Sequence, residues 1–154
     1  MSNPKKSINK KTAKITVNDA MNKEILERGT VDVIVREELM EKLASGKPLR
    51  IKLGIDPSGP DLHIGHAVVL RKIKQFQKAG HNVIIIIGDW TARIGDPTGK
   101  NEMRPQLTKA QVKQNAAKYL KQIFLILDKS KTEIVWHSKW FDKFNLQDVL
   151  NLLG

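Results

Sequence analysis

Residues 49–66 constrain the fold more than any other stretch of the 154-residue chain. Between Ile51 and Ile55, apolar residues alternate with charged or small ones, a pattern that predicts a β-strand. Prolines and a glycine within positions 57–60 then end the strand, because these residues fit neither a sheet ladder nor the interior of a helix. From Ala67 onward the pattern is that of a helix. The sequence therefore predicts a strand–loop–helix junction.

Two histidines, His63 and His66, lie in this junction, with Gly65 between them. Such junctions bind nucleotides in parallel α/β sheets, because the first turn of a helix offers free N–H groups and the positive end of its dipole to phosphate. Gly65 lacks a Cβ atom, so a ligand can approach the backbone there. His-x-Gly-His alone is a weak pattern, since histidines at a helix start also cap the helix or pack against it. The junction is thus a candidate phosphate-binding site with a purely structural alternative.

A second strand is predicted at Asn82–Ile87, where a continuous run of β-branched residues indicates burial on both faces. The helix before it ends at Gly80. We expect this helix to have an apolar face and an exposed basic face. The apolar face consists of Val69, Leu70, Ile73 and Phe76. The basic face consists of Arg71, Lys72, Lys74 and Lys78. Strand, helix and strand within about forty residues form a βαβ unit, so the strands are expected to be parallel with a right-handed crossover.

The residues before the first strand divide into a basic, flexible tail at 1–14 and helices at 15–48. Asn18 is placed to cap a helix that runs through Glu27. Thr30 is placed to cap a second helix, which ends at Ser45 and Gly46. The buried positions expected on that second helix are Val33, Ile34, Val35, Leu39 and Leu43.

The residues after the second strand predict another helix, a third strand and the start of a last helix. Thr108 is placed to cap a helix that runs to about Leu127, with core positions at Val112, Tyr119, Ile123 and Leu127. The pattern then predicts a strand at Thr132–His137, a loop from Phe141 onward and a helix at Leu146–Leu153.

Composition narrows the classes of function. The formal net charge of +11 fits a polyanionic partner such as RNA, although a basic tail gives the same number. The absence of cysteine excludes disulfides, thiolate catalysis and cysteine-bound zinc. The longest apolar run, Val83–Ile87, is too short to cross a bilayer, and the lysine-rich N-terminus has no apolar core of a signal peptide. We therefore expect a cytoplasmic protein without a membrane partner.

A long glycine-rich loop, residues 88–100, follows the second strand. Connections between packed elements usually need only about two to six residues, so this length indicates a function. Gly-Asp-Pro by itself is more often a turn than a site. The carboxyl ends of neighbouring parallel strands meet at one edge of the sheet, however, so this loop and the His63–His66 loop are expected to face one crevice. Two polar loops converging there predict a nucleotide and a second substrate.

These motifs together resemble one family. Residues 56–66, Asp-Pro-Ser-Gly-Pro-Asp-Leu-His-Ile-Gly-His, match the signature of the class I aminoacyl-tRNA synthetases. With residues 75–81 and the Gly-Asp-Pro-Thr-Gly-Lys of residues 95–100, the chain from 19 to 154 resembles the bacterial tyrosyl-tRNA synthetases. The tryptophanyl enzymes are a weaker match, because they usually carry Asn as the last signature residue and lack the second motif. Small nucleotidyltransferases share His-x-Gly-His on a similar fold, but the loop through Lys100 argues against them.

The resemblance implies an α/β fold with the Rossmann-like parallel sheet of the class I catalytic domain, of which residues 49–154 form the first half. It implies that tyrosine reacts with ATP to give tyrosyl-adenylate and pyrophosphate, and that the tyrosyl group then passes to tRNA(Tyr) during translation. The nucleophile is the carboxylate of the substrate, so catalysis rests on positioning and charge stabilisation. Mg²⁺ would arrive with ATP, since no carboxylate cluster is built to hold it. Full-length relatives are homodimers.

The resemblance also assigns roles to residues. It implies catalytic roles, chiefly contacts to the triphosphate and pyrophosphate, for His63, His66, Ser58, Lys100 and Arg104. It implies that ATP and the adenylate are bound by Gly54, Asp56, Ser58, His63, Gly65 and His66. It places Asp96, Asp89 and Thr91 in the tyrosine pocket, with Asp96 paired to the α-ammonium group.

The sequence departs from the family pattern in two respects. Lys52 stands where many relatives carry a tyrosine that contacts the phenol of the substrate, so phenol recognition is left to other residues. The Lys-Met-Ser-Lys-Ser loop of the second half is absent, and Asp128–Lys131 echoes it only in a turn. Two hypotheses follow: a synthetase fragment that still activates tyrosine, or a catalytically silent fragment that at most binds ATP.

Overall fold

The computed structural model describes residues 18–94 and 106–153. The predicted tail at 1–14 and three predicted site residues, Asp96, Lys100 and Arg104, lie outside these residues. The elements are, in chain order, α1 (Asp19–Glu27), α2 (Arg36–Ala44), β1 (Arg50–Ile55), α3 (Ile64–Lys78), β2 (Asn82–Ile87), η1 (Thr91–Arg93), α4 (Lys109–Ile123), η2 (Lys129–Lys131), β3 (Thr132–Trp136), α5 (Ser138–Phe141) and α6 (Leu146–Leu153).

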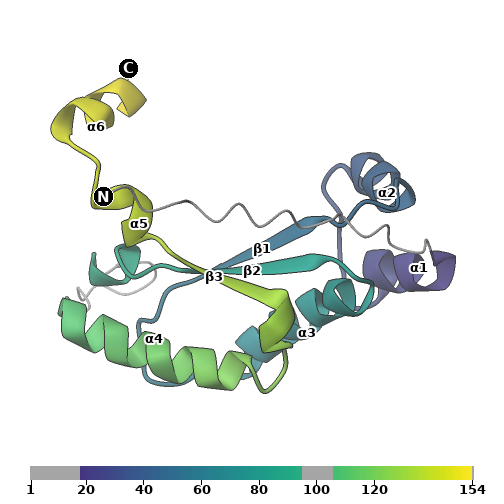
Figure 1. The fold of residues 1–154 in the computed structure, drawn as a ribbon, viewed down its shortest axis with the longest axis horizontal. Helices are drawn as coiled ribbons and strands as arrows, with labels where there is room; N and C mark the ends of the chain where they lie inside the picture. Colours follow the sequence, from purple (N-terminus) through teal and green to yellow (C-terminus); the bar gives the residue numbers. More distant parts are fainter. Residues whose placement is uncertain (1–17, 95–105, 154) are drawn as a thin grey trace, which may run out of the picture.

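The three strands form one parallel sheet in the order β1-β2-β3. Leu53 of β1 pairs with Ile85 of β2, and Ile85 pairs with Ile134 of β3. Helices α3 and α4 connect the strands and lie on the same side of the sheet (Figure 1). The predicted α/β fold with a parallel sheet is confirmed, and the second strand has the predicted boundaries.

The core lies between this face of the sheet and the two helices. Val83, Ile85 and Ile87 of β2 are completely buried. They pack with buried side chains from α3 and with three of the core positions predicted for the α4 region, Tyr119, Ile123 and Leu127. The fourth predicted position, Val112, is also buried, at 1% exposed. Helix α4 itself ends at Ile123, and a turn carries the chain on to Leu127.

The first helix is capped as predicted, whereas the second begins later than predicted. Asn18 accepts a hydrogen bond from the Met21 N–H at 3.1 Å, and α1 ends at Glu27. Helix α2 begins at Arg36 rather than after Thr30, because the Asp32 carboxylate takes the Val33 N–H at 2.7 Å and Val35 adopts a positive φ of 57°. The predicted burial of Ile34 and Val35 is therefore wrong: they are 89% and 57% exposed.

Three expectations for α3 are also wrong, and the first concerns Lys74, which is half-buried and donates to Gln77 Oε1 at 3.0 Å. Val69 is 44% exposed rather than in the core. Lys72 is half-buried rather than solvated, and its Nζ donates to the carbonyl oxygens of Ile25, at 2.9 Å, and Arg28. Burial lowers the pKa of Lys72. An ammonium group at the end of α1 satisfies carbonyls that have no partner within that helix, so Lys72 fastens α1 to α3.

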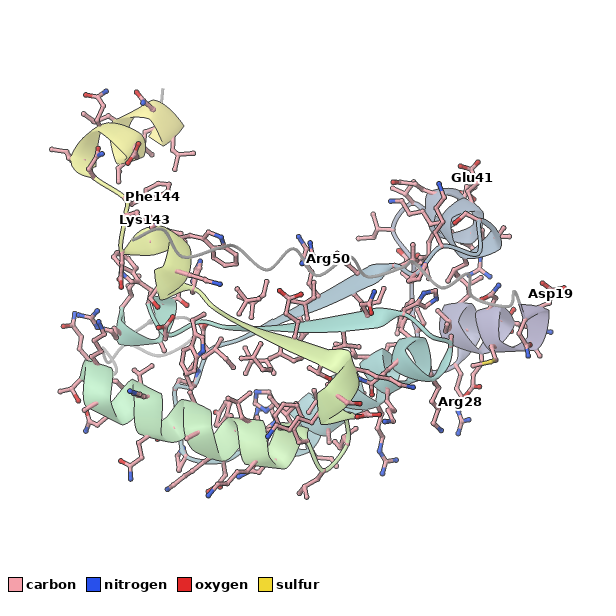
Figure 2. All side chains as sticks on the ribbon, in the orientation of Figure 1. Asp19, Arg28, Glu41, Arg50, Lys143 and Phe144 are labelled. Atoms are coloured by element: carbon pink, nitrogen blue, oxygen red, sulfur yellow. The ribbon has the colours of Figure 1, made fainter. Side chains whose placement is uncertain are left out.

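A short helix, α5, occupies Ser138–Phe141, between the predicted third strand and the predicted loop. Its first amide, the Ser138 N–H, donates to Asp89 Oδ1 at 2.9 Å, so the helix starts at a contact between residues distant in sequence. Helix α6 follows beyond Lys143 and Phe144 and extends away from the sheet (Figure 2). Within residues 18–94 and 106–153, no helix combines the length and apolar character needed to span a bilayer.

Charge is distributed unevenly over these elements. Residues 62–88, which contain α3, hold four basic and no acidic residues. The basic residues of α4 are exposed, namely Lys109, Lys113, Lys118 and Lys121, and that helix also carries no carboxylate. Carboxylates gather instead on α1 and α2, including Glu24, Glu38 and Glu41.

Two buried polar side chains tie the strands to α3. His81 is 4% exposed, its Nδ1 accepts the Leu49 N–H at 3.2 Å, and burial lowers its pKa. Gln77 is 2% exposed and bonds to both backbone groups of Asp128, accepting from its N–H at 2.8 Å and donating to its carbonyl at 3.1 Å. It therefore fixes the turn that precedes β3.

Replacing Gln77 by leucine should lower the free energy of unfolding by roughly 1–3 kcal/mol, because the Asp128 N–H loses its acceptor, while the Asp128 carbonyl keeps the Thr132 hydroxyl as a donor. Urea unfolding followed by circular dichroism measures this. Gln114→Leu on the exposed side of α4 is the matched control and should change stability by no more than about 0.5 kcal/mol. Equal losses in the two variants would contradict the role of Gln77.

Candidate nucleotide-binding site

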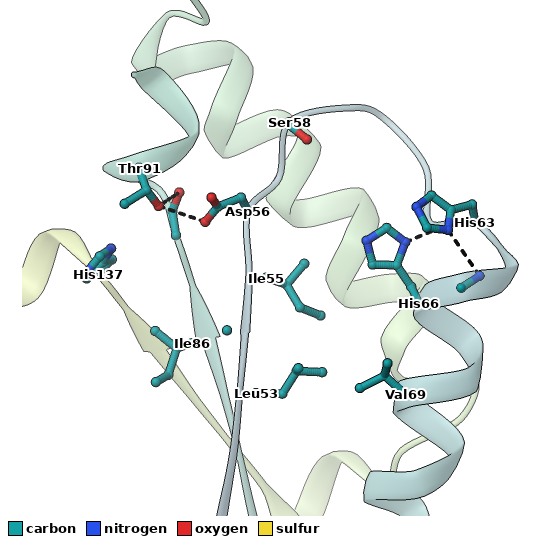
Figure 3. Close-up of a pocket in the computed structure, with 13 residues that line it drawn as sticks. Leu53, Ile55, Asp56, Ser58, His63, His66, Val69, Ile86, Thr91 and His137 are labelled. Carbon is teal, nitrogen blue, oxygen red and sulfur yellow. Dashed lines mark hydrogen bonds between the residues drawn. The ribbon is translucent and has the colours of Figure 1, made fainter. Parts of the chain in front are cut away.

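A cavity of about 670 Å³ lies at the carboxyl ends of β1 and β2, beside the first turn of α3 (Figure 3). Parallel sheets bind ligands at this end, because the loops that follow the strands converge there. The lining residues are Leu53, Gly54, Ile55, Asp56, Ser58, His63, Gly65, His66, Val69, Ile86, Gly88, Thr91 and His137.

The structure brings together most of the described residues that the sequence singled out. Seven of them line the cavity, namely Gly54, Asp56, Ser58, His63, Gly65, His66 and Thr91. Asp89 does not: its carboxylate accepts the Ser138 N–H, and Asp89 lines a separate cavity of about 280 Å³. Asp96, Lys100 and Arg104 are not among the described residues, so their roles stay predictions.

His63 and His66 cap α3 and also line the cavity. His63 Nδ1 accepts the Gly65 N–H at 3.1 Å, and His66 Nδ1 accepts the His63 N–H at 3.2 Å, so each histidine satisfies a backbone donor of the first turn (Figure 3). The ring centroids are 3.9 Å apart. An Nδ1 atom that accepts carries no hydrogen, so both neutral rings hold their hydrogen on Nε2. The structural role as caps thus leaves both Nε2–H groups as donors.

The surroundings of His66 favour its uncharged form. Burial, followed by the nearby His63, lowers the pKa of His66. A proton added at Nδ1 would also displace the backbone N–H that this atom accepts. Neutral donors at the N-terminus of a helix are chemically suited to phosphate oxygens.

The two loops meet at Asp56 and Thr91. Thr91 Oγ1 donates to Asp56 Oδ1 at 2.7 Å, which joins the end of β1 to the loop after β2 (Figure 3). Gly88 makes this contact possible: a Cβ atom there would stand 1.7 Å from Asp56 Oδ1 and 2.5 Å from Thr91 Oγ1. The prediction that the loops share one crevice is confirmed for these residues.

Sequence reasoning missed the cavity roles of Gly88 and His137. Gly88 is the first residue after β2, so its place at a strand end was a usable signal. His137 follows β3 in the same way, and its ring packs against that of Phe141 with centroids 4.2 Å apart. The apolar wall formed by Val69 and Ile86 gave no signal, because such residues have the same pattern as a core.

Gly88→Ala should lower the free energy of unfolding by about 1–3 kcal/mol, because the added methyl group displaces the Asp56 carboxylate. Gly54→Ala is the matched control, since a Cβ atom at that position meets nothing within 4 Å. Urea unfolding of both variants measures the difference. A Gly88→Ala protein as stable as the Gly54→Ala protein would show that the two loops are not packed as described.

Stability should fall on acidification below a pH of about 6.5. The folded-state pKa values of His66 and His81 are lowered, so the unfolded chain binds protons at a pH where the folded chain does not. The free energy of unfolding should be flat above that pH and decline as pH falls toward the lowered pKa values. Urea titrations between about pH 8 and about pH 5.5 test this, and a His66→Asn, His81→Gln double variant should show a shallower decline. A free energy of unfolding that increases on acidification over this range would contradict the lowered pKa values of His66 and His81.

Comparison with known proteins places these features in a family. The family model described as tRNA synthetases class I (W and Y) matches residues 44–154. The tyrosine–tRNA ligase of Dehalococcoides mccartyi strain 195 is 53% identical over 138 residues, which cover 88% of this chain and 35% of that protein. The tyrosine–tRNA ligase of Carboxydothermus hydrogenoformans is 56% identical over 133 residues, 84% of this chain and 32% of its own length. The chain thus spans about a third of the length of these curated relatives.

Solved structures agree on the fold. The tyrosyl-tRNA synthetase of Archaeoglobus fulgidus superposes with a TM-score of 0.70 at 23% identity, over 88% of this chain and 39% of that one. A mitochondrial tyrosyl-tRNA synthetase of Aspergillus nidulans gives a TM-score of 0.64 at 26% identity, over 82% and 40%. A tryptophanyl-tRNA synthetase of Plasmodium falciparum gives 0.60 at 17% identity, over 92% and 43%. The chain belongs to the family of class I aminoacyl-tRNA synthetases that comprises the tryptophanyl and tyrosyl enzymes.

Proposed function

We propose that this chain forms the ATP-binding part of a tyrosine–tRNA ligase. That enzyme joins tyrosine to ATP to give tyrosyl-adenylate and pyrophosphate and then transfers the tyrosyl group to tRNA(Tyr). The observation that carries the proposal is the pair of capping histidines, which line a cavity at the start of α3 and use only their Nδ1 atoms as caps. The curated relatives, more than 50% identical and named tyrosine–tRNA ligases, support tyrosine over tryptophan.

The chemistry suits a site without a strong base. A carboxylate oxygen of tyrosine attacks the α-phosphorus of ATP, the bond from that phosphorus to the bridging oxygen of the β-phosphate breaks, and pyrophosphate leaves. His63 and His66 donate hydrogen bonds to phosphate oxygens, which gain charge in the transition state. The α3 dipole favours the same charge.

Other cavity residues hold the nucleotide in this proposal. Gly54 lets the ribose approach β1, since nothing lies within 4 Å of where its Cβ would stand. Asp56, held by Thr91, binds the adenylate, and the Ser58 hydroxyl serves a phosphate oxygen. Mg²⁺ enters with ATP, bound to its phosphate oxygens, as the resemblance implies.

The amino-acid side of the site rests more on the resemblance. Asp96 pairs with the α-ammonium group of tyrosine, Lys100 and Arg104 engage pyrophosphate, and Thr91 lies beside the tyrosine. Asp89 contributes through the Ser138 backbone that it holds. The whole enzyme acts as a homodimer, as the resemblance implies. It acts in the cytoplasm, where its tRNA product is used in translation.

A second candidate function is nucleotide binding without catalysis. Its support is that the chain spans only about a third of the length of its curated relatives. Positioning two substrates contributes roughly 7–11 kcal/mol to such reactions, and a site with fewer walls loses part of this contribution.

The test is tyrosine-dependent exchange of labelled pyrophosphate into ATP by the purified chain. We expect exchange, with a loss of at least about 100-fold in a His63→Ala, His66→Ala double variant, because each donor to developing charge contributes about 10²–10³-fold. Thr108→Ala is the matched control: it removes the capping box of α4, outside the cavity, and should leave exchange unchanged.

If the folded protein catalyses no pyrophosphate exchange, the proposal that this chain activates tyrosine is contradicted. ATP binding, measured by equilibrium dialysis on the same sample, then decides the second candidate. Binding that is lost in the histidine double variant supports a nucleotide-binding module, and no binding excludes both.

A further inference from the structure

One face of α4 contacts the loop that carries the candidate site. Asn115, Tyr119 and Gln122 are spaced four and three residues apart, so they share one side of the helix. Each lies against a different part of residues 56–66. Sequence analysis gave α4 only a core role, through residues such as Tyr119.

Gln122 makes two hydrogen bonds to this loop. Its Oε1 accepts the Leu62 N–H at 2.8 Å, and its Nε2 donates to Asp61 Oδ1 at 2.7 Å. Leu62 directly precedes His63, the residue that caps α3, and its side chain packs on the main core. The half-buried amide of Gln122 thus fixes the backbone one residue before the first histidine.

The other two residues support the loop on either side of its apex. Asn115 Nδ2 donates to the carbonyl oxygen of Pro57, which is fully buried next to Ser58. Tyr119 is 3% exposed and meets the His66 ring edge-on, with centroids 6.0 Å apart. The loop is therefore held at its start, at its end and behind the second histidine.

We propose that Gln122 is a positioning residue of the site: together with Asn115 and Tyr119 it fixes the loop so that His63 and His66 hold their capping geometry before any ligand binds. The consequence for catalysis rests on the proposed function, whereas the effect on the histidines does not. Donors that are already aligned need no reorganisation when phosphate charge develops, and ordering the loop in advance removes an entropic cost from binding.

The neighbourhood of Gln122 allows an exchange of partners. In Gln122→Glu, a carboxylate replaces the amide that donates to Asp61, so two carboxylates repel each other. In Asp61→Asn, the side chain keeps an oxygen that accepts from Gln122. In the double variant, the new amide at position 61 donates to the new carboxylate at position 122, which still accepts the Leu62 N–H. Gln114→Glu makes the same charge change on the exposed side of α4 and is the control.

The primary measurement is the imidazole ¹⁵N spectrum of the folded full chain at about pH 7.5, a pH at which histidine is neutral. The wild type should show well-separated Nδ1 and Nε2 signals for His63 and His66, as a single Nε2–H tautomer requires. Gln122→Glu should move these signals toward each other as tautomers average, while Asp61→Asn and Gln114→Glu leave them unchanged. The double variant should restore the wild-type spectrum. Gln122→Met, which removes both hydrogen bonds at similar length, serves if Gln122→Glu does not fold.

Separated signals in folded Gln122→Glu or Gln122→Met, or a double variant that is not restored, would overturn the proposal. Where the wild type catalyses exchange, kcat should fall roughly 10- to 100-fold in Gln122→Glu, with the KM for tyrosine unchanged, and recover in the double variant. If the wild type shows no exchange, the proposed activity fails, yet the spectra still decide the role of Gln122.

Discussion

Burial of β2 between two parallel neighbours is the constraint on which the rest of the structure depends. Val83, Ile85 and Ile87 are fully buried against α3 and α4. Because the strand order follows the chain, each right-handed crossover places its helix on the same side of the sheet. The carboxyl ends of all three strands then lie together, and selected residues between Leu53 and His137 line a single cavity.

The histidines of this cavity combine two roles that sequence analysis had to keep as alternatives. As caps, His63 and His66 use their Nδ1 atoms on the backbone of α3. That use leaves the Nε2–H groups for a ligand and selects the tautomer that donates. A cap and a phosphate donor are therefore compatible in one ring, because a neutral imidazole accepts on one nitrogen and donates from the other.

Local patterns predicted the strands, α1, α3 and α4, because periodicity and capping residues are signals that a short stretch of sequence contains. The failures come from contacts and conformations that periodicity does not encode. Val69 lines the cavity although its spacing fits a core, and Lys72 is drawn in by carbonyls of α1. The positive φ of Val35 delays α2. Seven predicted site residues share the cavity because motifs at strand ends converge in a parallel sheet. The contact of Asp89 with Ser138 could not be predicted, because the two residues are remote in sequence.

The uneven distribution of charge gives the part of the chain that the structure describes an electric dipole. Carboxylates are concentrated on α1 and α2, while α3 and α4 carry lysines and one arginine without any acidic residue. A polyanion that approaches within the Debye length, about 8 Å at physiological ionic strength, exerts a torque on such a molecule. This torque turns the basic helices α3 and α4 toward the polyanion. The orientation of first encounter is thus set by side chains that stand outside the cavity, and added salt weakens it without altering the site.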